Sequence, residues 1–175
     1  MSAGRYDVVS YSFDSSTSYF LDTNIWLLVF GPSAPGDRRA RVYSDAVKRL
    51  RASGAKTFID AIVVSEFANA WARFAFDRAR AAKFKTFRNS GAFKPVAQDI
   101  AVSLRSMLLF ATPIGTAFAN IDLGSLVANF EGGDSDFNDL LIVETCRSKS
   151  FVLVTDDADM KDCDVPIVTA NQALL

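Results

Sequence analysis

The sequence predicts an α/β fold in which a mostly parallel β-sheet carries helices on both faces. Short apolar runs rich in β-branched and aromatic residues alternate with longer segments of helical period, and this alternation is typical of βα units. Half of the 175 residues are apolar and 22% are charged, so the chain can build one ordinary globular core. We therefore expect a single domain at residues 19–175, preceded by an extension at residues 1–18.

In the first half of the chain, residues 1–18 are expected to be an irregular or edge-strand extension, and residues 20–28 a strand that runs into a helix. Residues 38–53 are expected to form a second helix, residues 56–60 a short strand and residues 61–83 a long helix. The 38–53 helix follows a Pro- and Gly-rich loop, has apolar residues recurring on one side, and precedes Gly54, a stop signal.

The second half begins at a break that Gly91 and Pro95 predict after the long helix. Helices are expected at 96–110, before Pro113, at 117–130, and at 137–148 after the Gly-rich turn at 132–136. Two apolar segments, 151–155 and 165–169, are expected to be strands.

Aspartates follow two of the apolar runs that predict strands. Asp22 follows Tyr19-Phe-Leu21, and Asp156-Asp157 follows Phe151-Val-Leu-Val-Thr155. In a parallel α/β sheet, ligands bind at the carboxyl ends of the strands. A plain N-cap would also explain Asp22, but a carboxylate among such apolar neighbours needs a partner.

Further acids lie near predicted helix starts. Glu66 borders the buried side of the 61–83 helix, where a salt bridge to Arg73 or the helix dipole would also explain it. Asp136 and Asp139 share one face at the start of the 137–148 helix, where capping is common. Carboxylates brought together repel each other unless a cation joins them, so the combination predicts a metal site formed by Asp22, Glu66, Asp139 and Asp157.

The chain has no histidine, which excludes Ser-His-Asp triads, Cys-His dyads and His-ligated zinc sites. Carboxylate ligands favour Mg²⁺ or Mn²⁺, which can activate water for attack on a phosphodiester. Cys146 and Cys163 have no metal-ligand spacing, so we expect reduced thiols in a cytoplasmic protein. No signal-peptide pattern and no apolar run long enough for a bilayer occurs in the sequence, so no membrane association is expected.

Charge is unevenly distributed, although the net charge is only −1. Residues 71–94 carry seven Lys or Arg against one Asp, whereas residues 131–175 carry ten acids against three bases. A polyanion held across a metal site would suit this pattern, and a solvated helix face with an acidic end would also produce it. The basic residues that we expect to contact RNA are Arg73, Lys83, Lys85, Arg88 and Lys94.

At its acidic motifs the chain resembles the PIN-domain ribonucleases, the family of VapC-type toxins. The matching segments are Phe20-Leu-Asp-Thr-Asn24, Ser65-Glu-Phe67, Ser135-Asp-Phe-Asn-Asp-Leu-Leu-Ile142 and Leu153-Val-Thr-Asp-Asp157. The resemblance implies a three-layer α/β/α fold and Mg²⁺- or Mn²⁺-dependent hydrolysis of RNA. It places the acidic quartet on Asp22, Glu66, Asp139 and Asp157, with supporting contacts from Asn24, Asp136, Thr155 and Asp156.

Several alternatives remain open on the sequence alone. The resemblance implies the toxin of a toxin–antitoxin pair as one role, and the extra segments at 1–18 and 84–130 depart from a compact toxin. A catalytically weak PIN-like module that binds RNA or protein is the alternative function. A haloacid-dehalogenase-type phosphatase would need Asp where Asn24 stands, and a phospho-receiver domain would carry its acidic pair after the first strand. Apolar residues on the 61–83 helix could form a homodimer face or an antitoxin groove, or belong to the core: Trp71, Phe74 and Phe76.

Overall fold

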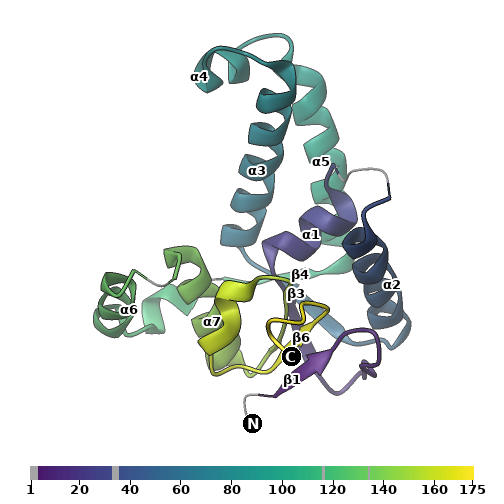
Figure 1. The fold of residues 1–175 in the computed structure, drawn as a ribbon, viewed down its shortest axis with the longest axis vertical. Helices are drawn as coiled ribbons and strands as arrows, with labels where there is room; N and C mark the ends of the chain where they lie inside the picture. The colour runs from purple at the N-terminus through teal and green to yellow at the C-terminus, as the bar shows by residue number, and fades with distance from the viewer. Residues whose placement is uncertain (1–3, 33–35, 116, 134) are drawn as a thin grey trace.

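The computed structural model describes residues 4–32, 36–115, 117–133 and 135–175, and its centre is a six-stranded, wholly parallel sheet (Figure 1). The strand order is β1-β6-β5-β2-β3-β4. The strands are β1 Arg5–Asp7, β2 Ser18–Leu21, β3 Lys56–Ile59, β4 Thr112–Pro113, β5 Val152–Val154 and β6 Ile167–Thr169. The predicted parallel α/β architecture is therefore confirmed.

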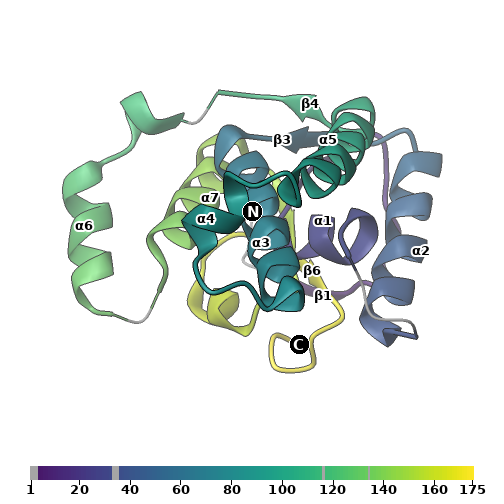
Figure 2. The same ribbon diagram turned by 90° about the horizontal axis from the view of Figure 1, so that it is seen from above.

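Helices cover both faces of the sheet because its crossovers run in two directions. Moving along the chain, β2, β3 and β4 step toward one edge, whereas β4, β5 and β6 step back toward the other. Right-handed crossovers then place the intervening helices on opposite faces, as Figure 2 shows for α1 and α7. The helices are α1 Thr23–Phe30, α2 Arg38–Ala52, α3 Ala61–Ala79, α4 Phe84–Arg88, α5 Phe93–Phe110, α6 Leu123–Glu131 and α7 Phe137–Lys149.

The two central strands bring distant parts of the chain to the same edge. β2 and β5 pair in register, with Leu21 opposite Val154. The backbone N–H of Asp22 then donates to the Val154 carbonyl at 3.0 Å. Their inner residues are fully apolar and buried, as expected for strands covered on both faces. The residues that follow these strands, Asp22 and Thr155, therefore lie side by side.

The middle of the chain departs from the prediction in its helix boundaries. α3 ends at Ala79 because Arg80 adopts a left-handed backbone with φ 49°, and a short helix, α4, follows where none was expected. Pro95 does not break the chain but lies in the first turn of α5, where its missing N–H costs no helical hydrogen bond. The segment expected as one helix at 117–130 is divided into a 3₁₀ turn and α6, which begins after the capping residue Asp122.

The antiparallel pair α3 and α5 projects from the sheet with α4 at its tip (Figure 1). Aromatic rings fill the space between these helices, since Phe87 contacts both Phe76 and Phe93. Phe87 is buried, and Phe84 packs against Phe76 and beneath the guanidinium of Arg73. These phenylalanines therefore stabilise the projecting hairpin.

Among the described residues, no helix is both long enough and apolar enough to span a bilayer.

The first strand, β1, lies at the edge of the sheet, as predicted for an edge strand in the N-terminal segment. β1 pairs with β6, and the Arg5 guanidinium donates to the carbonyl of Val165 at 2.9 Å. From α2, Arg49 donates to the carbonyl of Tyr11 at 2.8 Å and also to that of Val8. The N-terminal segment is thus attached to both the sheet and α2.

Candidate functional site: a cluster of carboxylates at the sheet edge

Asp22 is the most deeply buried acid of the candidate site, with 4% of its surface exposed. It caps α1 by accepting from the Thr23 N–H at 2.6 Å. Its other oxygen accepts from the Thr155 hydroxyl and from the Asn24 amide, both at 2.7 Å. Burial nevertheless raises the pKa of Asp22 to about 6, against the lowering effect of these hydrogen bonds, and Asp157 and Glu66 add repulsion. Asp22 is therefore an N-cap and also a member of a carboxylate cluster.

Glu66 reaches the same place from the first turns of α3. Its two oxygens accept from the Thr23 hydroxyl and the Asn138 amide, each at 2.6 Å. Glu66 consequently links the starts of α1 and α7. The ion pair with Arg73 that could have explained this residue does not form: Arg73 lies over the Phe84 ring instead.

Asp139 lies in the first turn of α7, half-buried beside the other acids. Desolvation raises its pKa to about 7, and the charges of Asp22 and Asp157 are the next largest causes. The structure therefore places Asp22, Glu66, Asp139 and Asp157 within electrostatic range of one another. Asp136 caps α7 by accepting from the Asn138 N–H at 2.8 Å, so its contact with the cluster is electrostatic.

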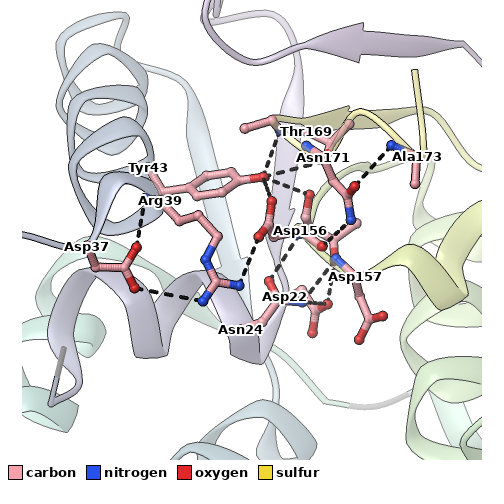
Figure 3. Close-up of polar contacts among 12 residues, drawn as sticks. Asp22, Asn24, Asp37, Arg39, Tyr43, Asp156, Asp157, Thr169, Asn171 and Ala173 are labelled. Atoms are coloured by element: carbon pink, nitrogen blue, oxygen red, sulfur yellow. Dashed lines mark hydrogen bonds and ion pairs between the residues drawn. The ribbon is translucent and has the colours of Figure 1, made fainter. Parts of the chain in front are cut away.

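The doublet after β5 divides into two roles, which Figure 3 displays. The Asp156 carboxylate points away from Asp22 and accepts from the Tyr43 hydroxyl at 2.7 Å. Asp157 remains beside the cluster and caps the following 3₁₀ turn, Ala158–Asp162. Asn24 fixes this arrangement, since its amide donates to Asp22 and Thr155 while its oxygen accepts from the Asp156 N–H at 3.2 Å. This geometry favours Asp157 over Asp156 as a direct metal ligand.

Whether these residues suit a divalent cation can be judged from their chemistry. The donor set is all carboxylate, which matches Mg²⁺ or Mn²⁺. Burial is the main cause of the raised pKa values of Asp22 and Asp139, and repulsion from neighbouring acids adds to it; a cation would offset both. Within the described part of the chain, no three acids stand close enough together to ligate one ion. Both oxygens of Glu66 are occupied by Thr23 and Asn138, so cation binding would require these side chains to rearrange. The residue types therefore fit the cation, and the acids would have to draw closer together to ligate it.

The predicted RNA-binding cations lie along the projecting hairpin, and all five are exposed: Arg73, Lys83, Lys85, Arg88 and Lys94. Arg73 is seven residues after Glu66 on α3, so it points from nearly the same face about 10 Å farther from the cluster. The others lie beyond it, at or near α4.

Of the aromatic residues that could form a homodimer face or an antitoxin groove, Trp71 and Phe76 pack against other rings, and Phe74 is 41% exposed.

Three residues near the cluster were not assigned a role from the sequence. Thr23 and Asn138 are the donors to Glu66, and each directly adjoins one of the predicted acids, which was the available signal. Asp60 follows β3 and caps α3 by accepting from the Val63 N–H at 3.0 Å. It is 2% exposed, its other oxygen has no partner among the described residues, and burial raises its pKa.

Comparisons with known proteins agree with the fold. The PIN domain family matches residues 19–166. Among solved structures, the chain is similar to the crystal structure of VapBC2 from Rickettsia felis bound to a DNA fragment from their promoter, with a TM-score of 0.54 and 19% identity. That match covers 87% of this chain and 98% of the other. No curated protein sequence matches. Because the family match extends over most of the chain, this protein belongs to the PIN domain family.

Proposed function

We propose that this protein is a Mg²⁺- or Mn²⁺-dependent endoribonuclease. The observation that carries the proposal is the grouping of four carboxylates, including buried Asp22, within electrostatic range of one another near the carboxyl ends of β2 and β5. PIN domains are generally nucleases, and the buried position of Asp22 argues against a purely solvated acidic surface. When bound, a divalent cation would make water a better nucleophile and offset charge on the leaving oxygen.

The chain's own residues would hold and orient the reacting groups. Asp22, Asp139 and Asp157 supply oxygens for the cation, while Thr155 and Asn24 fix the orientation of Asp22. Glu66 holds the starts of α1 and α7 together through Thr23 and Asn138. The exposed Lys and Arg side chains, of which Arg73 is the first, would bind the RNA backbone where it leaves the cluster along α3.

The direct test is cleavage of single-stranded RNA by the wild-type protein with Mn²⁺, with Mg²⁺ and in EDTA. We expect cleavage only with a cation, and a loss of at least 100-fold in Asp22→Asn and Asp139→Asn, because each variant removes a ligand charge. Asp162→Asn is the matched control, since it removes an exposed carboxylate from the nearby 3₁₀ turn. Cleavage in EDTA, or full activity in either cluster variant with an unchanged circular dichroism spectrum, would contradict the proposal.

A narrower proposal is that the nuclease is the toxin of a toxin–antitoxin pair in the cytoplasm. It is supported by the shared fold with VapBC2. Expression of the wild-type protein should arrest bacterial growth, and the product of an adjacent gene should relieve the arrest and co-purify with it. Growth arrest by Asp22→Asn equal to that of the wild type would separate any toxicity from the proposed nuclease activity.

A further inference from the structure

A cavity of about 460 Å³ adjoins the carboxylate cluster, between α1 and the start of α2. Its lining includes Asn24 and Asp157, so it is continuous with the residues that would hold the cation. This volume lies within the range of small-ligand sites in proteins. A nucleotide next to the scissile bond could therefore extend into the cavity without leaving the cluster.

The two sides of the cavity differ chemically. Leu27, Leu28 and Pro32 form an apolar side, whereas Asp37, Arg39 and Asp156 form a polar side. A nucleotide has the same division, because the faces of its base are apolar and its phosphate is anionic. Bases stack on or pack against apolar surfaces regardless of their identity, while an arginine can bind a phosphate through two parallel hydrogen bonds.

Arg39 is held loosely in the structure. Its guanidinium lies 3.6 Å from Asp156 and 3.8 Å from Asp37, and 65% of the side chain is exposed. Asp156 and Asp37 are only 10% and 21% exposed, but both pairs are too long for a hydrogen bond and involve an exposed guanidinium, so each contributes little stability. Asp156 also accepts from the Tyr43 hydroxyl at 2.7 Å (Figure 3), so it keeps a close partner when Arg39 turns away. The guanidinium can consequently move to a ligand at small cost.

A second cavity, of about 630 Å³, lies on the other side of the Arg39–Asp156 pair. Arg38 and Asn171 help to line it. Arg39 therefore stands between two cavities, and a second arginine lies on the side away from the cluster. α1 lies between α2 and α3 (Figures 1 and 2), so α2, which carries Arg38 and Arg39, and the basic hairpin lie on different sides of α1.

We propose that Arg39 binds the phosphate of the RNA nucleotide that flanks the scissile bond, and that the base of this nucleotide packs against Leu27, Leu28 and Pro32. The proposal rests on the proposed ribonuclease function and names the path of the RNA. The lining of this cavity carries three carboxylates, Asp37, Asp156 and Asp157, against the single guanidinium of Arg39, so Arg39 is the side chain in it that can attract a phosphate. Replacing Arg39 should therefore impair RNA binding more than replacing another arginine of α2.

The experiment measures binding of a single-stranded RNA by fluorescence anisotropy in the Asp139→Asn background, which keeps the RNA uncut. Arg39→Gln is compared with Arg51→Gln, the same change at the exposed far end of α2. We expect Arg39→Gln to weaken binding about tenfold and to reduce the slope of log affinity against log salt by about 0.7, the value for one phosphate contact on a single strand. Arg51→Gln should change the affinity less than twofold.

A methylphosphonate scan then locates the contact. Each phosphate of the RNA is replaced in turn by an uncharged methylphosphonate. At the phosphate flanking the scissile bond, the replacement should weaken RNA binding by the protein that retains Arg39. The same replacement should leave RNA binding by the Arg39→Gln variant unchanged. Additive losses at every phosphate, or equal effects of Arg39→Gln and Arg51→Gln, would overturn the proposal.

The outcomes also separate this proposal from the proposed function. Metal-dependent cleavage that Arg39→Gln leaves with an unchanged KM overturns the role of Arg39 alone. Arg39-dependent RNA binding by a wild-type protein that cleaves no RNA with either cation overturns the ribonuclease and supports the binding site. Unchanged RNA binding by Arg39→Gln, together with loss of binding to a protein partner, overturns the proposal in favour of a protein ligand.

Discussion

The carboxylate cluster should make the stability of the metal-free protein depend on pH in a direction that is unusual for aspartates. We consider the free energy of unfolding in EDTA between pH 5 and pH 8, for the wild type and for Asp22→Asn. Asp22 is the best site for this comparison because it is 4% exposed, so solvent screens its charge little. The perturbation removes one buried charge and keeps a side chain of the same shape.

The expected magnitude follows from the raised pKa of Asp22, which is about 6 in the folded protein against 3.8 for an ordinary aspartate. Because the folded value is the higher one, the folded state binds the proton more tightly, and protonation stabilises the fold. This contribution is complete below about pH 4, where it is about 3 kcal/mol, and it is lost as the pH rises through 6. Between pH 5 and pH 8 the loss from Asp22 is about 1.4 kcal/mol.

The assay is urea unfolding followed by tryptophan fluorescence at both pH values. The wild type should lose about 1.4 kcal/mol more than Asp22→Asn between pH 5 and pH 8. Removal of the Asp22 charge also lowers the pKa of Asp139, for which Asp22 is the second-largest cause of the shift, so the two effects have the same sign. If the wild type and the variant lose equal stability over this range, Asp22 is not a buried member of a repelling cluster.

Two further changes test residues around the site and at a helix end. Tyr43→Phe removes the hydroxyl that donates to Asp156 and accepts from the Ala170 N–H at 2.7 Å, so we expect a loss of about 2 kcal/mol in urea unfolding; a loss below about 0.5 kcal/mol would show that water replaces these bonds. Ser150→Gly should raise the free energy of unfolding by about 0.5 kcal/mol, and with it the melting temperature. Ser150 ends α7 with φ 55°, a left-handed conformation that glycine adopts without strain. A lower melting temperature for this variant would show that the serine has a stabilising contact in the folded state.

The sheet and the acidic cluster were predictable because their signals are local. The apolar runs before Asp22 and Asp157 have the length and composition of buried strands, and β2 and β5 lie where those runs do. The parallel arrangement then places both aspartates at one edge, a rule that needs no knowledge of side-chain contacts. The alternation of strands with helical segments was enough to predict that arrangement.

Other features depended on contacts that the sequence pattern does not contain. The separate roles of Asp156 and Asp157 come from Tyr43, which is 113 residues away from Asp156. α3 ends at Ala79 because Arg80 adopts a left-handed conformation that is commoner for glycine, and the helical signal around it continues to Lys83. The short strand β4 consists of Thr112 and Pro113, and Pro113 is tolerated there because the strand lies at the edge.

The pairing of β1 with β6 has a consequence for how the molecule reaches its final form. Arg5 binds the carbonyl of a residue 160 positions later, so this contact requires β6 to be in place first. Once β2, β5 and β6 are paired, only residues 8–17 separate β1 from the sheet, and docking of β1 then closes a short loop at small entropic cost. We therefore expect β1 to dock last and quickly, after the inner strands, and to open first when the folded protein unfolds locally.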